Sequence, residues 1–256
     1  MQKIKWGIIG PGYIGTAFAH SIQRASNSEL ISVFGRSKEK TNHFANLFNL
    51  QSFDSLEDFI SSDELDAVYV ATPHSDHFIY VLEAIKNNKH ILCEKPLTMN
   101  AYESMILLDL AQSSKVFLME AYMYRTHPQT LNILNNLNLL KKADKKILIE
   151  GSFGFKADIA KDHRLRNLAL GGGAILDVGC YPLSMSKLIA GYLQGLPFAE
   201  PKSIEATGRI DETGVDLQSE ARLVFSDTID AKISCAIDEE LANTLIISCG
   251  EISITA

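Results

Sequence analysis

The sequence has 256 residues, which is enough for one large domain or two modest ones, each able to bury a hydrophobic core. Hydrophobic residues make up 46% of the chain and charged residues 21%, as in ordinary globular proteins. The formal net charge of −7 argues against nucleic acid or an anionic membrane surface as a main partner, although a local site can still bind an anionic cofactor.

The cysteines and the start of the chain indicate the cellular compartment. The four cysteines are scattered and form no CxxC pair: Cys93, Cys180, Cys235 and Cys249. No secretory signal precedes the first apolar run, Ile4–Ile9, and this run is too short to span a membrane. We therefore expect reduced thiols in a cytoplasmic protein, with no disulfide frame, metal site or membrane partner.

The first half of the chain alternates short apolar runs with amphipathic stretches, a pattern typical of βαβ units around a parallel sheet. The expected strands are Ile4–Ile9, Leu30–Phe34, Ala67–Val70, His90–Cys93 and Val116–Met119. Helices are expected to begin where a capping side chain precedes an apolar stripe, at Ser55, Ser75 and Asn100. The pattern predicts an α/β Rossmann domain over residues 1–121.

In the second half of the chain, the spacing of the apolar residues changes. A helix is expected around Leu131–Leu140, a strand over Ile147–Phe155 and a glycine-rich helix start at Gly171–Gly173. Long strands with tight connections follow, at Ile204–Ile210, Leu217–Phe225, Ile229–Ile237, Thr244–Ser248 and Ile252–Thr255. They predict an α+β domain over residues 122–256 with an open, mostly antiparallel sheet.

A glycine-rich loop follows the first strand. Gly10-Pro11-Gly12-Tyr13-Ile14-Gly15 is a GxGxxG pattern, which is weak alone but here directly follows a strand and opens a helix. Gly10 permits the tight turn, Gly12 lets the backbone approach a pyrophosphate, and Gly15 lets the helix pack on the strand. The phosphates would lie at the helix N-terminus, beside Tyr13 and Ile14.

The residues after the second strand bear on which dinucleotide is bound. An NAD site has an acid there that accepts hydrogen bonds from the ribose 2′-hydroxyl, whereas this chain has Gly35-Arg36-Ser37. Arg36 carries a fork of donors suited to a phosphate, and Ser37 adds a hydroxyl. The alternative is that Arg36 is a solvated loop cation. The sequence favours NADP over NAD.

Five blocks of sequence, in order along the chain, resemble the glucose–fructose oxidoreductase/inositol dehydrogenase family. The blocks are Gly7–Gly15, Val70–His77, Cys93–Leu97, Glu120–Pro128 and Gly171–Tyr181. The tyrosine at position 181 makes the chain resemble the dimeric dihydrodiol dehydrogenases and the NADP-dependent xylose dehydrogenases within that family. Members usually continue for several further strands, so we expect the second sheet to be incomplete at its C-terminus.

The resemblance implies a nicotinamide stacked between the two domains and a homodimer or tetramer built through the sheet of the second one. It also implies a set of cofactor-binding residues after the strands of the first domain. They are Thr72, Pro73, His74, His77, Glu94, Lys95 and Pro96. The Lys95–Pro96 bond is a candidate cis bond.

The family motifs also imply the catalytic groups. Oxidising a secondary alcohol by hydride transfer requires removal of its hydroxyl proton, which a tyrosine can accept if an ammonium favours its phenolate. The resemblance assigns these roles to Tyr181 and Lys95, with Asp177 orienting the substrate or the tyrosine. The structural alternatives are that Lys95 is a surface lysine, that Tyr181 is a half-buried aromatic residue of the core, and that Asp177 is a charge in the first turn of a helix.

Other polar residues carry weaker expectations. His74 and His77 have no neighbouring cysteine or carboxylate set in the sequence, which makes a metal site a poor interpretation. Arg125 and His127 lie near the expected domain junction, where contact with a polar substrate and structural pairing are equally plausible. Loops after Phe155 would shape the substrate pocket.

These observations lead to one main hypothesis and two alternatives. The main hypothesis is an NADP-dependent oxidoreductase that transfers hydride between nicotinamide and a sugar or a vicinal diol or carbonyl compound. The first alternative is a non-catalytic NADP-binding regulatory protein. The second is a redox-assisted glycoside hydrolase, which releases sugar without net change in the cofactor.

Overall fold

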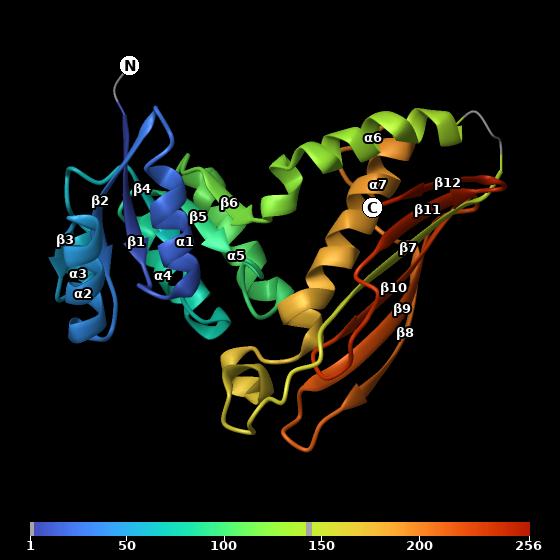
Figure 1. The fold of residues 1–256 in the computed structure, drawn as a ribbon. Coiled ribbons are helices and arrows are strands. Elements are labelled where there is room, and N and C mark those ends of the chain that lie inside the picture. The colour runs from blue at the N-terminus through green and yellow to red at the C-terminus, as the bar shows by residue number, and fades with distance from the viewer. Residues whose placement is uncertain (1–2, 142–144) are drawn as a thin grey trace. The chain divides into compact units, whose positions relative to one another are not determined.

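The computed structural model describes residues 3–141 and 145–256. The chain divides into two compact units, Met1–Ala121 and Tyr122–Ala256, each with its own sheet (Figure 1). The units are described separately.

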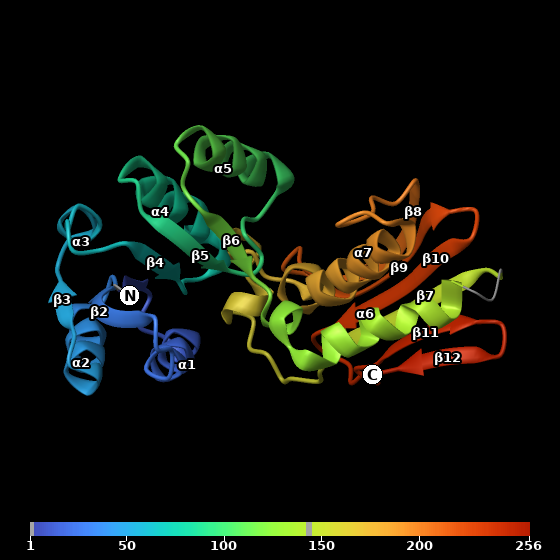
Figure 2. The same ribbon diagram turned by 90° about the horizontal axis from the view of Figure 1, so that it is seen from above.

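The first unit is built around a six-stranded parallel sheet in the order β3-β2-β1-β4-β5-β6. Its strands are β1 Ile4–Ile9, β2 Ser28–Phe34, β3 Gln51–Phe53, β4 Ala67–Val70, β5 His90–Glu94 and β6 Leu118–Ala121. One face carries α1 (Tyr13–Ile22) and α2 (Lys38–Phe48). The opposite face carries α3 (Leu56–Ile60), α4 (His74–Lys86) and α5 (Ala101–Ser113), as Figure 2 shows.

Helices on both faces explain why the strands read as continuous apolar runs. Strand β4 is buried at every position. Its Val68 and Val70 pack in the cluster under α3, α4 and α5, whereas Tyr69 packs in the cluster under α1 and α2. A strand covered on both faces needs no polar side chain, so its apolar run marks it clearly in the sequence.

Two of the three expected helix starts are confirmed. The Ser55 hydroxyl accepts from the Asp58 backbone N–H at 3.0 Å, and the Asn100 side chain accepts from the Glu103 N–H at 3.0 Å. The expectation for Ser75 was wrong, because α4 begins one residue earlier and its N-cap residue is Pro73. Proline holds its own φ near −65° and has no N–H to leave unpaired, so it suits a helix boundary.

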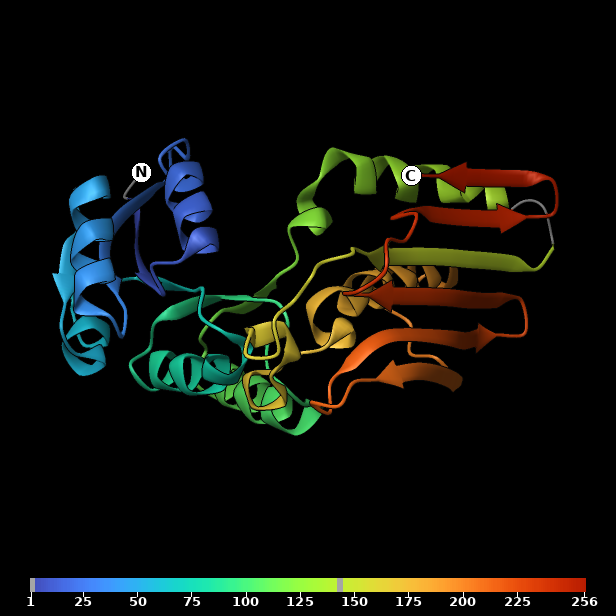
Figure 3. The same ribbon diagram turned by 60° about the horizontal axis from the view of Figure 1, so that its bottom comes forward.

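The second unit carries a six-stranded sheet in the order β12-β11-β7-β10-β9-β8, seen nearly face-on in Figure 3. Its strands are β7 Ile147–Gly154, β8 Ser203–Ile210, β9 Asp216–Ser226, β10 Ile229–Ala236, β11 Leu245–Cys249 and β12 Ile252–Thr255. Neighbouring strands are antiparallel except β7 and β10, which run parallel. The predicted fold class, a Rossmann unit followed by a mostly antiparallel sheet, is confirmed.

Helices α6 (Pro128–Lys141) and α7 (Cys180–Gln194) cover one face of this sheet, and the other face is open (Figure 1). Alternate side chains of β9 point to these two different faces. Leu223 and Phe225 are buried in the core that the helices complete, while Arg222 lies on the open face.

Short helical turns connect these elements: η1 Met123–Thr126, η2 Arg164–Arg166, η3 Leu168–Leu170 and η4 Ile175–Gly179. The expected glycine-rich helix start is a π-helical turn, η4, that leads directly into α7. Within the described residues, one helical stretch, Leu168–Gln194, is long and apolar enough to cross a membrane. Half of an 18-residue window within that stretch is buried inside the protein, so its length and composition are weak evidence for a membrane span.

Candidate functional site

The glycine loop between β1 and α1 has two crowded positions and one open one. A Cβ on Gly10, whose φ is +104°, would lie 2.7 Å from the Ala71 carbonyl oxygen, and a Cβ on Gly15 would lie 2.6 Å from the Gly10 carbonyl oxygen. A Cβ on Gly12 would meet nothing within 4 Å. The loop is therefore closed toward the protein and open at the start of α1, where backbone N–H groups favour an anion.

Residues around the loop fit a bound dinucleotide. Tyr13 is 91% exposed and Ile14 packs against the core beneath. Among the described residues, the hydroxyl oxygen of Thr72 is buried with no hydrogen-bond partner, and its methyl carbon would lie 3.1 Å from a Cβ on Gly10. A buried orphan hydroxyl beside an open anion site is the feature a ligand would satisfy.

Arg36 lies where the chain leaves β2, and it has a partner. One guanidinium nitrogen of Arg36 is 3.1 Å from a carboxylate oxygen of Asp76, on the first turn of α4. The Arg36 side chain is 69% exposed. The hydroxyl of Ser37 accepts from the Lys40 N–H at 3.4 Å and so caps α2. Arg36 is therefore held in place while keeping most of its surface accessible to an anion.

The loops after β4 and β5 are joined through His77. This side chain is fully buried, with one ring nitrogen 2.8 Å from the Pro96 carbonyl oxygen and the other 3.0 Å from that of Thr72. Burial lowers the pKa of His77, and the carbonyl contacts oppose that effect only in part. His74, one turn earlier, is also largely buried.

Lys95 follows β5 at the carboxyl edge of the parallel sheet, where open α/β sheets bind ligands. The Lys95–Pro96 peptide bond is cis. Just before it, the carboxylate of Glu94 is buried and accepts a short hydrogen bond from the Tyr69 hydroxyl. The first unit thus brings the predicted cofactor residues together at one edge of its sheet.

Asp177 and Tyr181 lie in the second unit, on the π-helical turn η4 and the first turn of α7. Asp177 is 7% exposed. Both terminal nitrogens of Arg164 donate to one Asp177 oxygen, at 3.3 and 3.4 Å. Arg164 is therefore the counter-ion of the predicted catalytic carboxylate.

The ring of Tyr181 lies within a group of aromatic side chains. Its centroid is 5.5 Å from that of Tyr122, 6.3 Å from that of Tyr124 and 5.4 Å from that of Phe153. The contacts with Tyr122 and Phe153 are edge-to-face and the contact with Tyr124 is tilted, and together they restrict the plane of the ring. Tyr124 is anchored in turn, because its hydroxyl donates to Ser184 at 2.8 Å.

A cavity of about 530 Å³ lies beside Tyr181 within the second unit. Much of its lining is apolar or aromatic and includes Met123, Tyr124, Phe153, Tyr181, Pro182 and Met185. Its polar lining residues are His127, Gln129, Thr130, Ser152, Asn243 and Thr244. Such a lining suits a compact ligand with an apolar body and a small number of polar groups.

Other candidates have structural partners. The Arg125 guanidinium donates to Ser184 at 2.7 Å and lies 4.3 Å from the ring centroid of Phe198. Over residues 3–141 and 145–256, no group of three or more His, Cys, Asp or Glu side chains is arranged to hold a metal ion.

Three site residues escaped sequence analysis because their roles depend on tertiary contacts. Asp76 pairs with Arg36, Glu120 binds the backbone of Leu97, and Arg164 pairs with Asp177. The first two lie inside blocks that the sequence had marked, so those blocks were the available signal. Nothing local distinguished Arg164 from its neighbour Arg166.

A parallel sheet with an open glycine loop at a helix start, followed by a unit with a cavity beside a tyrosine, is typical of a dinucleotide-dependent oxidoreductase. Comparison with known proteins gives the same class. Residues 4–122 match the model of an oxidoreductase family with an NAD-binding Rossmann fold. The chain belongs to this family, that of glucose–fructose oxidoreductase and inositol dehydrogenase, and is an NAD(P)-binding oxidoreductase.

Individual relatives cover nearly the whole chain. It is 35% identical to a trans-1,2-dihydrobenzene-1,2-diol dehydrogenase of Xenopus tropicalis, over 96% of this chain and 72% of that protein. It is 28% identical to a D-xylose 1-dehydrogenase (NADP⁺) of Haloferax volcanii, over 91% of this chain and 69% of that one. The crystal structure of an NAD-binding protein from Listeria innocua superposes with a TM-score of 0.82 at 25% identity, covering 98% of this chain and 72% of that one.

Proposed function

We propose that this protein is an NADP-dependent oxidoreductase that transfers hydride between nicotinamide and a secondary hydroxyl or carbonyl group of a sugar or vicinal diol. The observation that carries the proposal is Arg36, exposed at the end of β2 where an NAD site would have an acid. In this proposal residues 1–121 bind NADP, and residues 122–256 bind the substrate and mediate assembly.

The proposed chemistry divides between the two units. When bound, the nicotinamide supplies the acceptor or donor of the hydride. Tyr181 takes the substrate hydroxyl proton during oxidation and returns it during reduction, and Lys95 favours the ionised phenol. Asp177, paired with Arg164, orients the substrate or the tyrosine. The loop at Gly12 and the side chain of Arg36 hold the pyrophosphate and the 2′-phosphate.

The cavity beside Tyr181 supports the choice of substrate class. Its apolar and aromatic lining favours a ring with few polar groups, and a vicinal diol presents adjacent hydroxyls for the sparse polar groups. The names of the relatives, a dihydrobenzene diol dehydrogenase and a xylose dehydrogenase, cover the same two classes. We therefore place cyclic diols first and aldoses second.

The test is a cofactor-coupled screen of aromatic diols, polyols and aldoses, run with NADP and NAD in parallel. We expect NADPH absorbance to change with at least one cyclic diol or sugar. Lys95→Met should abolish turnover and retain NADPH binding, whereas Lys86→Gln, which breaks a pair with Glu83 near the end of α4, should leave turnover unchanged. Normal turnover by Lys95→Met would refute the mechanism.

Two other outcomes would point to the alternative functions. Tight NADPH binding without turnover across the panel would indicate a non-catalytic NADP-binding protein. Release of free sugar without net change in NADPH would indicate redox-assisted glycoside cleavage.

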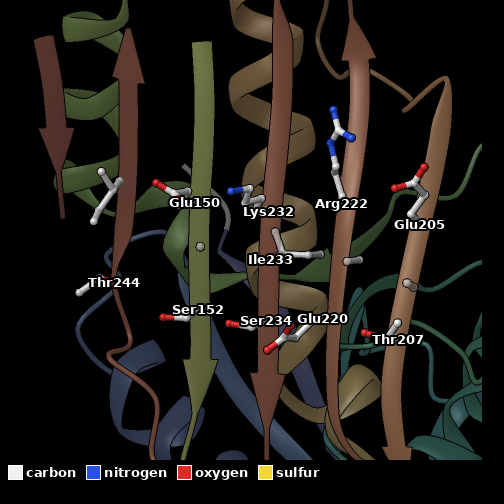
Figure 4. Close-up of a pocket in the computed structure, with 14 residues that line it drawn as sticks. Glu150, Ser152, Glu205, Thr207, Glu220, Arg222, Lys232, Ile233, Ser234 and Thr244 are labelled. Atoms are coloured by element: carbon white, nitrogen blue, oxygen red, sulfur yellow. The ribbon is translucent and has the colours of Figure 1, made fainter. Parts of the chain in front are cut away.

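The open face of the second sheet is the proposed assembly surface. A shallow depression of about 510 Å³ lies on it (Figure 4). A charged row crosses four strands here, formed by Glu150, Lys232, Arg222 and Glu205. Mixed charges suit a polar, hydrated interface between copies of this chain. Sedimentation analysis should show a dimer or tetramer that Lys232→Glu weakens, and a monomeric wild-type protein would refute this assignment.

A further inference from the structure

The backbone that carries Lys95 is held from two neighbouring elements. The Leu97 N–H donates to a carboxylate oxygen of Glu120 on β6, at 2.8 Å. On the other side, the Pro96 carbonyl oxygen lies 2.8 Å from the Nδ1 nitrogen of His77 on α4. The segment Lys95–Leu97 leaves the sheet between these two contacts, so its path depends on them.

The position of His77 is itself fixed by packing. It lies on α4, whose next turns place Tyr80 and Val81 in the core of the first unit. The ring is fully buried, and its Nε2 nitrogen faces the Thr72 carbonyl oxygen at 3.0 Å. His77 therefore spans the loop after β4 and the loop after β5, with each ring nitrogen directed at a different backbone carbonyl.

This arrangement leaves His77 little scope for direct contact with a cofactor. A ring with no exposed surface and with both nitrogens at backbone carbonyls has no nitrogen to offer an external ligand. A neutral imidazole donates one N–H, so it forms one of the two hydrogen bonds at a time, whereas an imidazolium donates both. The Nδ1 N–H can donate to Pro96 in the imidazolium and in the neutral tautomer that is protonated at Nδ1.

We propose that His77 is a positioning residue for Lys95: through the Pro96 carbonyl it fixes the backbone from which the Lys95 side chain extends. This inference rests on the proposed function, in which Lys95 acts at the reacting centre. A displacement of about 1 Å in a catalytic group costs up to about 100-fold in rate, so one hydrogen bond at the next residue can control turnover.

Two substitutions separate the two ring nitrogens. The amide nitrogen of asparagine occupies roughly the place of Nδ1, and that of glutamine the place of Nε2. His77→Asn can therefore keep the bond to Pro96, while His77→Gln can keep only the bond to Thr72. Val81→Ala, which opens a cavity one turn along the same buried face of α4, controls for simple loss of stability.

The first measurement is hydrogen–deuterium exchange of the peptide covering residues 94–98, which needs neither substrate nor cofactor. Exchange should rise about tenfold in His77→Gln and stay within about threefold of wild type in His77→Asn and Val81→Ala. Equal exchange in His77→Gln and His77→Asn would overturn the inference.

The second measurement separates positioning from cofactor binding. His77→Gln should lower kcat about tenfold or more and leave the Kd for NADPH within about twofold, while His77→Asn should retain most of kcat. A rise in Kd with unchanged kcat would overturn the inference in favour of a cofactor contact. A wild-type protein with no turnover would defeat the proposed function, and the exchange measurement would still decide whether His77 holds the turn.

Discussion

Two glycines of the loop after β1 differ in the space available for an added methyl group: Gly12 has room for it and Gly15 does not. Alanine substitutions at the two positions should therefore separate effects on folding from effects on cofactor binding. Gly12 has extended backbone angles, φ −100° and ψ −169°, and a Cβ there would meet nothing within 4 Å. Gly12→Ala should therefore change the free energy of unfolding by less than about 1 kcal/mol. The same methyl group would occupy the space that a pyrophosphate needs, so NADPH affinity should fall at least about 100-fold.

Gly15→Ala should behave differently. Its Cβ would lie 2.6 Å from the Gly10 carbonyl oxygen, a contact that α1 can relieve only by moving away from the loop. Overpacking of this kind costs about 1–3 kcal/mol, or about 4–12 °C in the melting temperature of a unit this size. Thermal unfolding and NADPH fluorescence titration of both variants test the two predictions.

The result that refutes this reasoning is specific. If Gly12→Ala melts like the wild type and still binds NADPH with unchanged affinity, the dinucleotide does not approach the backbone at Gly12. If Gly15→Ala melts like the wild type, the close approach of α1 to the loop does not constrain the fold.

Three further predictions follow from ion pairs and burial at the site. Asp76→Asn removes the carboxylate that competes with the 2′-phosphate for Arg36, so NADPH should bind about 3–10-fold more tightly. NADH affinity should change less than twofold, and fluorescence titration measures both. Glu83→Gln, near the far end of α4, controls for the loss of one negative charge. Arg164→Met removes the guanidinium that donates to the buried Asp177 carboxylate, so kcat/KM should fall by about 10–100-fold, and added guanidinium should restore part of it. Burial lowers the pKa of His77 in the folded protein, and the negative charges of Glu94 and Asp76 offset this effect only in part. The imidazole therefore binds a proton more readily in the unfolded chain than in the folded protein. The free energy of unfolding should therefore fall as the pH drops from about 7 toward 5, and urea titrations of His77→Gln should show a weaker dependence.

The central strands of the parallel sheet could be predicted from the sequence because helices cover them on both faces and their apolar runs are continuous. Ile4–Ile9 and Ala67–Val70 were predicted with the bounds that the structure has. The three-residue strand β3, Gln51–Phe53, was missed, because it is an edge strand with little burial and no apolar run. The expected strand Val116–Met119 begins two residues later in the structure, at Leu118.

The site could be predicted where its chemistry is local in sequence. Gly10 and Gly15 act within one turn, so their spacing carries the geometry. The pairs Arg164–Asp177 and Leu97–Glu120 join residues 13 and 23 positions apart, and no local pattern encodes such contacts. The roles assigned to Lys95, Tyr181 and Asp177 still rest on the family motifs.

The loop after β1 and the end of β2 differ in how freely they can vary. At Gly10 and Gly15 an added carbon would meet backbone oxygens at 2.7 and 2.6 Å, so almost any substitution there is felt by the fold. Arg36 is 69% exposed and held by one ion pair to Asp76. In the proposed function, cofactor preference can therefore change through positions 36 and 76 while Gly10 and Gly15 stay as they are.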